Sequence, residues 1–127
     1  MHSEEFTPLE LTEFVANVVR GFTFRFTDEK ALQDGLELAF GELPLEREFN
    51  IDARSRIDFL IALPNPVGVE VKVSQSPTEV ARQVRRYLKS DKIDGLVLVT
   101  TRRRHRKLEQ EEFDKPVEIV WLGSSGF

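Results

Sequence analysis

The chain has 127 residues, of which 40% are hydrophobic and 31% charged, a composition typical of a single globular domain with a hydrophobic core. It contains no cysteine, which excludes disulfide scaffolds, thiolate metal sites and cysteine nucleophiles, and its two histidines are few for a histidine metal site or a Ser-His-Asp triad. There is no apolar run of about 18 residues and no signal-peptide pattern, so we expect a cytoplasmic protein without a membrane span.

The net charge of −4 conceals a segregation of basic from acidic residues. Residues 82–107 contain ten Lys or Arg and two Asp, whereas the rest of the chain contains eight basic and twenty acidic residues. Such a basic segment within an acidic protein favours a surface that faces a polyanion. A solvated helix face beside a loop explains the same charges equally well.

The N-terminal residues predict a helix followed by an extended segment. Residues 7–10, Thr-Pro-Leu-Glu, have the form of a capping box with proline in the first turn, and apolar residues then recur at helical spacing. We therefore expect a helix over residues 8–20. The alternating Phe22, Phe24 and Phe26 indicate a short strand or an extended arm.

A second helix is expected from a cap at Thr27 or Asp28 to about Phe40. Its predicted buried stripe is formed by Leu32, Leu36, Ala39 and Phe40. The polar residues along an adjoining face are Glu29, Gln33 and Glu37.

The clearest pattern in the chain is that of a β-hairpin. After a first strand over residues 46–52, apolar residues alternate over residues 57–63 and again over residues 67–73. Residues 64–66, Pro-Asn-Pro, separate the two runs and predict a three-residue loop.

The C-terminal half predicts one more helix and two more strands. Residues 76–79, Ser-Pro-Thr-Glu, repeat the capping box and begin a helix that extends to about Lys89. The apolar run over residues 96–99 indicates a buried central strand. The remaining expected elements are a helical segment after the basic residues 102–107, a strand over residues 117–122 and a tail over residues 123–127.

Two carboxylates and a lysine converge on the predicted hairpin. A loop of residues 64–66 places Asp58 opposite Lys72, with Glu70 as the diagonal neighbour of Asp58 on the same face. A four-residue loop would break this arrangement. Two crowded carboxylates suit Mg²⁺ or Mn²⁺, which can activate water for phosphoryl chemistry, and an adjacent ammonium can orient that water. An ordinary salt bridge from Lys72 on an exposed strand is the alternative interpretation.

The order of these residues resembles the PD-(D/E)XK nuclease superfamily, in which a strand carrying Asp precedes a strand carrying Glu-x-Lys, here Glu70-Val71-Lys72. The resemblance implies that Asp58 and Glu70 bind a divalent metal together with the backbone carbonyl of Val71, and that Lys72 assists the attacking water. The chain departs from the family pattern at Ile57, where the family name has proline.

A second motif, Gln83-x-x-x-Tyr87, follows on the third predicted helix and is similar to the QxxxY motif of RecB-like nucleases. The resemblance implies that Gln83 lies near the active site and Tyr87 near the nucleic-acid backbone. A helix that packs Tyr87 on the sheet is the alternative. The family also implies an acidic residue on the first core helix, for which Glu29, with Gln33 beside it, is favoured over Glu37.

The resemblance implies an α/β fold with a restriction-endonuclease-like αβββαβ core, in which helices flank a mixed central sheet. Within a single domain spanning 1–127, residues 28–100 form this core, 1–26 a preceding helix and arm, and 101–127 the basic stretch, last strand and tail. Small phage or bacterial proteins of this superfamily have a similar overall outline.

The basic residues are then predicted to contact phosphates. Those predicted to bind nucleic acid, together with Tyr87, are Arg82, Arg85, Arg86, Arg102, Arg103, Arg104, Arg106 and Lys107. His105 is expected to be a surface residue or phosphate neighbour, and Trp121 and the phenylalanines are expected in the core.

The function expected from these features is a Mg²⁺- or Mn²⁺-dependent DNA endonuclease or exonuclease, directed by substrate structure or ends rather than by base sequence. A catalytically inactive nuclease-fold module that binds nucleic acid or a protein partner is the main alternative, and an ordinary α/β protein with surface salt bridges is a third. A homodimer formed through the first helix and the phenylalanine arm is possible, although burial of a sheet edge within one chain explains those residues equally well.

Overall fold

The computed structural model describes residues 5–123, so residues 124–127 of the predicted tail and residues 1–4 lie outside the description. Its elements, in chain order, are α1 (Pro8–Arg20), α2 (Glu29–Phe40), β1 (Leu45–Asn50), β2 (Arg56–Ile61), β3 (Val67–Lys72), α3 (Pro77–Leu88), β4 (Gly95–Thr100), the 3₁₀ helix η1 (Arg103–Gln110) and β5 (Val117–Trp121). The predicted α/β class is confirmed.

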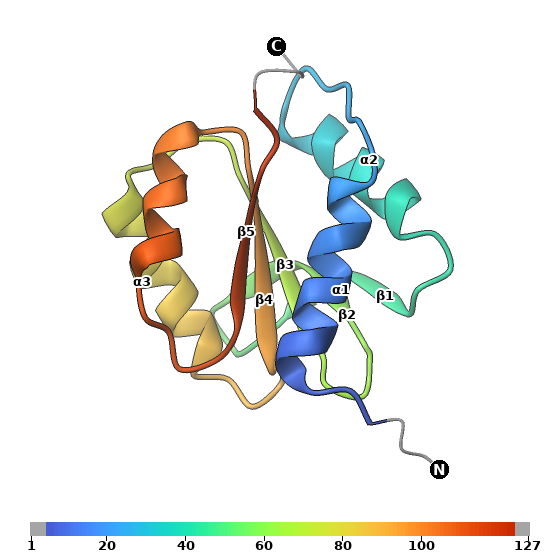
Figure 1. Ribbon diagram of the computed structural model, residues 1–127, viewed down its shortest axis with the longest axis vertical. Coiled ribbons are helices and arrows are strands. Elements are labelled where there is room, and N and C mark those ends of the chain that lie inside the picture. The colour runs from blue at the N-terminus through green and yellow to red at the C-terminus, as the bar shows by residue number, and fades with distance from the viewer. Residues whose placement is uncertain (1–4, 124–127) are drawn as a thin grey trace.

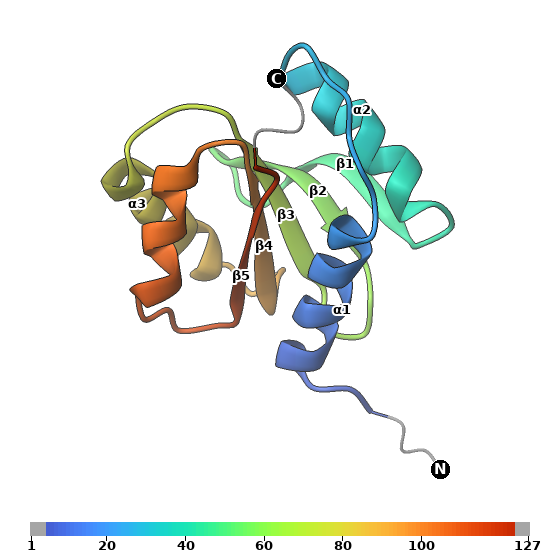
Figure 2. The same ribbon diagram turned by 45° about the horizontal axis from the view of Figure 1, so that its top comes forward.

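The five strands form one mixed sheet in the order β1-β2-β3-β4-β5. Strands β1 to β3 are antiparallel neighbours, and β3, β4 and β5 run parallel. Helices α1 and α2 lie on one face of the sheet, and α3 and η1 lie on the other (Figures 1 and 2). In the part of the chain that the structure describes, no helix is long and apolar enough to cross a bilayer.

Capping interactions set the beginning of each α-helix as the sequence predicts. Thr7 and Glu10 form a reciprocal capping box at α1, as do Ser76 and Glu79 at α3. At α2, the side chain of Asp28 accepts a hydrogen bond from the backbone nitrogen of Ala31 at 2.8 Å.

The phenylalanine arm is not a strand. Residues 22–26 form no ladder but connect α1 to α2 (Figure 1), and over residues 23–26 their side chains alternate between solvent and core. Phe24 and Phe26 are each 7% exposed, whereas Phe22 is 52% exposed. The expectation that the phenylalanines belong to the core is therefore wrong for Phe22 and also for Phe6 and Phe14, which are exposed.

The β2–β3 hairpin forms two residues away from the predicted register. Ile61 pairs with Val67, and continuing this register places Asp58 opposite Glu70 instead of opposite Lys72. Lys72 becomes the diagonal neighbour of Asp58. Because the shift is an even number of residues, Glu70 and Lys72 remain on the face of the sheet that α3 covers.

The loop is longer than predicted because its first residues bond elsewhere. Ala62 donates its backbone N–H to the carbonyl of Pro44 at 2.7 Å, and Leu63 donates to the carbonyl of Ile61 at 2.8 Å. Both bonds remove these residues from the hairpin ladder, so the loop spans residues 62–66.

A backbone distortion near Asp58 breaks the apolar alternation of β2. Phe59 packs in the core beneath α1 and α2, whereas Ile57 packs in the core beneath α3, although strict alternation would place both on one face. On the neighbouring strand, Glu48 has φ of 57°, so β1 is also distorted opposite Asp58, although the pairs Arg47–Phe59 and Phe49–Ile57 keep one register. The expectation that Ile57 and Phe59 share a face is therefore wrong, and Asp58 lies where the strand changes face.

Candidate metal and catalytic site

Asp58 and Glu70 are joined by hydrogen bonds between side chain and backbone. The backbone nitrogen of Asp58 donates to Oε1 of Glu70 at 3.1 Å, and the backbone nitrogen of Val71 donates to Oδ2 of Asp58 at 2.7 Å. These bonds continue the contact between β2 and β3 beyond Phe59, where the ladder of backbone pairs ends. The two carboxylates are thus held side by side, as the sequence predicts, but by a different register.

The carbonyl of Val71 points to the same side as these carboxylates. In a β-strand the N–H and C=O of one residue point to the same edge, and the N–H of Val71 bonds to Asp58. The Val71 side chain is buried in the opposite core. The backbone of Val71 therefore presents an oxygen beside Asp58, as the predicted metal set requires.

Lys72 lies beside Glu70 in a largely buried position. Its Nζ is 3.5 Å from Oε2 of Glu70, and the two side chains are 14% and 6% exposed. An ion pair this buried differs from the exposed salt bridge of the alternative interpretation, because both charges lose most of their hydration.

Tyr87 and Gln83 approach Glu70 from α3. The Tyr87 hydroxyl lies 3.2 Å from Oε2 of Glu70 and 3.3 Å from the carbonyl of Arg56, so it can donate to either one. Gln83 donates from Nε2 to the Tyr87 hydroxyl at 2.8 Å, and its Oε1 is buried without a partner among the described residues. Tyr87 is only 2% exposed, so its hydroxyl contacts Glu70 inside the protein and not a ligand at the surface.

The pKa values of the carboxylates reflect this burial. Burial first, and then the negative charge of Asp58, raise the pKa of Glu70 to about 8, while Lys72 opposes the shift. The pKa of Asp58 is also raised, chiefly by burial, although the hydrogen bond from Val71 opposes it. Without a cation the pair therefore retains a proton near neutral pH, since two adjacent carboxylates resist full ionisation.

Glu29 is the α2 acid that approaches this pair. Partial burial raises the pKa of Glu29, the charge of Asp58 raises it further, and the charge of Lys72 lowers it. The charges of Asp58 and Lys72 therefore both act on the ionisation of Glu29.

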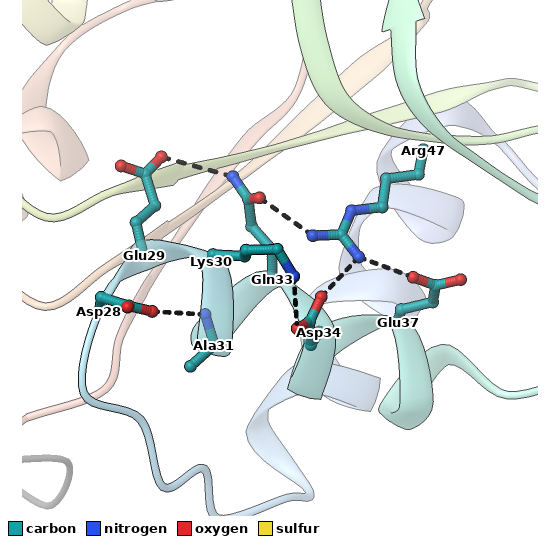
Figure 3. A network of polar contacts seen from close by, with 8 residues as sticks. All are labelled: Asp28, Glu29, Lys30, Ala31, Gln33, Asp34, Glu37 and Arg47. Carbon is teal, nitrogen blue, oxygen red and sulfur yellow. Dashed lines mark hydrogen bonds and ion pairs between the residues drawn. The ribbon is translucent and has the colours of Figure 1, made fainter.

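A polar network along α2 orients Glu29 (Figure 3). Arg47, from β1, donates to Oε1 of Gln33 at 3.2 Å. Because arginine only donates, this contact turns the amide nitrogen of Gln33 toward Glu29, whose Oε2 it meets at 3.4 Å. Arg47 also binds Glu37 at 2.9 Å and Asp34 at 2.7 Å. Glu37 is thus neutralised by Arg47, and the sequence did not reveal the role of Arg47 because it depends on contact between β1 and α2.

Two arginines of the basic stretch hold the loop that follows Lys72. Arg102 donates from Nε to the carbonyl of Val73 at 2.6 Å, and Arg104 donates from Nε and Nη2 to the carbonyl of Gln75 at 3.1 and 2.9 Å. Both side chains remain partly exposed at the C-terminal edge of β3 and β4. They support the loop in addition to any contact with phosphate.

His105 is completely buried, so the expectation of a surface position is wrong. Its Nε2 lies 2.8 Å from the carbonyl of Gln75, which can only accept, and its Nδ1 lies 2.6 Å from Oγ1 of Thr100. The neutral ring therefore donates from Nε2 to Gln75 and accepts at Nδ1 from the threonine hydroxyl. Burial lowers the pKa of His105.

The other predicted nucleic-acid residues lie on η1 and α3. Arg103 and Arg106 lie 6.0 and 5.7 Å from the centre of the partly buried Trp121 ring. Arg82, Arg85, Arg86 and Lys107 line one groove between α3 and η1.

The donor atoms fit a hard divalent cation. Carboxylate and carbonyl oxygens are preferred by Mg²⁺ and Mn²⁺, and Asp58, Glu70 and Val71 supply both types, with Glu29 nearby. Over residues 5–123, however, no group of three His, Cys, Asp or Glu side chains is close enough to hold a metal by itself. A metal site here would therefore depend on the carboxylates of Asp58 and Glu70 together with the Val71 carbonyl. Comparison with protein-family models, with curated proteins and with solved structures finds no match to this chain.

Proposed function

We propose that this protein is a metal-dependent nuclease of the PD-(D/E)XK type that hydrolyses phosphodiester bonds in DNA. The observation that carries the proposal is the buried contact of Asp58, Glu70 and Lys72 at the point where β2 leaves β3. A protein gains little stability by burying Glu70 and partly burying Asp58 when the pKa values of both rise, so a ligand that binds them offers a reason for their arrangement.

The topology supports the proposed restriction-endonuclease-like core. The run from α2 to β4 has the order helix, three antiparallel strands, helix, and a strand parallel to the third. This is the αβββαβ order that the sequence motifs imply.

Each residue of the site has a distinct role in the proposed reaction. A divalent cation supplies polarisation of the phosphoryl oxygen and acidification of a water molecule. Asp58 and Glu70 provide the negative charge that holds the cation, and Lys72 orients the attacking water and balances charge that develops on the phosphate. Tyr87, held by Gln83, fixes one oxygen of Glu70.

Substrate choice in this proposal depends on shape. The exposed cations of α3 and η1 suit phosphates, which carry no sequence information, so we propose structure- or end-directed cleavage by a cytoplasmic enzyme. Homodimerisation through α1 and the phenylalanine arm stays a prediction, with Phe14 and Phe22 as its exposed apolar residues.

The test is cleavage of a substrate panel in Mg²⁺ or Mn²⁺ by the wild type, Asp58→Asn and Lys72→Ala. The panel consists of linear duplex, single strand, flap, four-way junction and RNA. Metal-dependent cleavage that is lost in both variants supports the proposal, and the preferred substrate defines the subclass. Cleavage that survives both substitutions contradicts the site.

A second candidate is an inactive module that binds nucleic acid. It is favoured by the absence, within the described part of the chain, of three acidic or histidine side chains close enough to hold a metal. Binding of DNA without cleavage at every metal tried, and without stabilisation by metal, would establish this function in place of the nuclease.

A further inference from the structure

A groove of about 730 Å³ lies between α3 and η1, on the surface and away from the carboxylates. Its charged lining residues are Arg82, Arg85, Arg86, Lys89, Lys107 and Glu111. We call this the basic groove. With five cations and one acid, it opposes the net charge of −4 of the chain.

Two of these cations, Lys89 and Lys107, lack acidic partners. Arg85 is paired with Glu111 at 2.6 Å, and the charge of Arg82 helps to lower the pKa of Glu79. Lys89 and Lys107 form no ion pair or hydrogen bond through their side chains with any residue in 5–123. Arg47, by contrast, is neutralised by two carboxylates within the fold. Unpaired cations gathered in a concave surface favour a polyanionic ligand.

The basic groove and the carboxylate site lie on opposite flanks of α3. Gln83 faces Glu70 through Tyr87, whereas Arg85 follows Gln83 by two residues, which is about 200° around a helix of 3.6 residues per turn. Arg82 and Arg86 lie between the two flanks and also line a smaller hollow of about 220 Å³ that includes Gln83. Cations therefore continue from the site side of α3 to the basic groove.

We propose that the basic groove binds the phosphate backbone of the substrate nucleic acid outside the segment that is cut. This inference rests on the proposed nuclease function and adds a second contact region to it. A helix is roughly 10–12 Å wide, and phosphates of one strand recur about every 3.4 Å along duplex DNA, so crossing α3 takes about three or four nucleotides. The substrate must extend at least that far to one side of the cleaved bond.

The test substitutes the two lysines of the basic groove, Lys89 at the end of α3 and Lys107 on η1. Lys89→Glu, Lys107→Glu and the double variant are compared with Lys92→Glu, which has the same change in charge but lies outside the groove, over the ring of Phe49. Binding of a labelled long duplex is measured by fluorescence anisotropy in EDTA at several salt concentrations. Cleavage of long and truncated duplexes in Mg²⁺ gives kcat and KM.

We expect the double variant to bind the long duplex roughly tenfold more weakly at low salt, with the slope of log K against log salt reduced by about 1.8, because each phosphate contact contributes about 0.9. KM for long duplex should rise while kcat is unchanged, and KM for truncated duplex should not change. Lys92→Glu should behave like the wild type.

Equal behaviour of the double variant and Lys92→Glu would overturn the inference about the basic groove, and metal-dependent cleavage by the wild type would leave the nuclease proposal intact. An equal rise in KM for long and truncated duplexes would also overturn it, because the groove would then not bind a distant segment. If the double variant binds DNA more weakly than the wild type and Lys92→Glu, but the wild type never cleaves DNA, the basic groove is a DNA-binding surface and the nuclease proposal fails.

Discussion

The two faces of the sheet bury different kinds of side chain. The face covered by α1 and α2 buries aliphatic and aromatic residues, such as Leu32 and Phe59. The face covered by α3 and η1 buries a similar apolar cluster but also Glu70, Thr100 and His105. Burial of polar groups costs stability unless each finds a partner, so the second face has features that folding alone does not require.

The two faces also differ in where the partners of their buried polar groups lie. On α1, the buried Thr12 donates its hydroxyl to Pro8 of its own helix at 2.7 Å, which is a local bond. Glu70 instead contacts residues from β2 and α3, and His105 contacts residues from β4 and the loop before α3. The polar groups of the α3 face thus connect separate elements around one place, the end of β3.

The largest change in the free energy of unfolding is expected from a substitution on the face covered by α1 and α2. Phe59 is fully buried and its ring lies 5.8 Å from that of Phe40, so Phe59→Ala should lower the free energy of unfolding by about 3–5 kcal/mol. Chemical denaturation measures this change. A loss below 1 kcal/mol would contradict the assignment of Phe59 to a tightly packed core.

In the absence of metal, Glu70→Gln should instead increase the free energy of unfolding at high pH. In the folded protein the pKa of Glu70 is about 8, against an ordinary value of 4.5, so the folded state binds more protons between these two values. Stability of the wild type should therefore fall as the pH rises from about 4.5 to 8. Glu70→Gln removes this loss and should be more stable at pH 8 by a few kcal/mol, since each pKa unit corresponds to about 1.4 kcal/mol.

The measurement is the difference between the unfolding free energies of Glu70→Gln and the wild type in EDTA across that pH range. A difference that does not change with pH would contradict the buried, partly protonated pair. Lys92→Gln is a suitable control, because the charge of Lys92 is not among those that shift the pKa values of Asp58 and Glu70, so this variant should leave the pH profile unchanged.

Mg²⁺ should restore the stability that the wild type loses at high pH. Metal binding requires ionised ligands, so protons compete with it below the raised pKa values of Glu70 and Asp58. We expect saturating Mg²⁺ to raise the melting temperature more at pH 8 than at pH 6, and to have no such effect on Glu70→Gln. An equal shift at both pH values, or an equal shift in the variant, would indicate binding elsewhere.

The smallest expected effect concerns His105. Its folded pKa lies below the ordinary value of 6.5, so the stability that it contributes is complete above about pH 6.5 and is lost as the pH falls through the folded pKa. His105→Gln should remove this acid-side loss. Thermal unfolding of both proteins between pH 5 and 7 tests the prediction, and parallel curves would contradict it.

The sequence predicts local structure well where the determinants are local. The capping boxes at Thr7 and Ser76 are each contained within a few residues, and the structure confirms both of them. It also confirms the strands β2 and β3, although the apolar alternation of β2 breaks at Asp58. The hairpin register is less local, because Ala62 leaves the ladder to bond Pro44. Asp58 and Glu70 still meet because the resulting shift is even.

The candidate site was predictable as a set of residues but not as a geometry. The prediction of Asp58 and Glu70 rests on spacing, whereas the choice between Glu29 and Glu37 depends on Arg47, which comes from another element. His105 lies among arginines in the sequence, and its burial follows only from the contact of η1 with Thr100 and Gln75. Long-range contacts such as these have no signature in neighbouring residues.

The central claim is that the buried pair and Lys72 form a hydrolytic site, and cleavage by Lys72→Ala tests it most directly. This variant keeps both carboxylates and should still bind Mg²⁺, so its loss of activity reports chemistry and not metal affinity. The account predicts that metal-dependent cleavage of the preferred substrate falls by roughly 100-fold or more, as expected when a group that stabilises developing charge is removed. Equal cleavage by Lys72→Ala and the wild type, at matched Mg²⁺ occupancy, would contradict it.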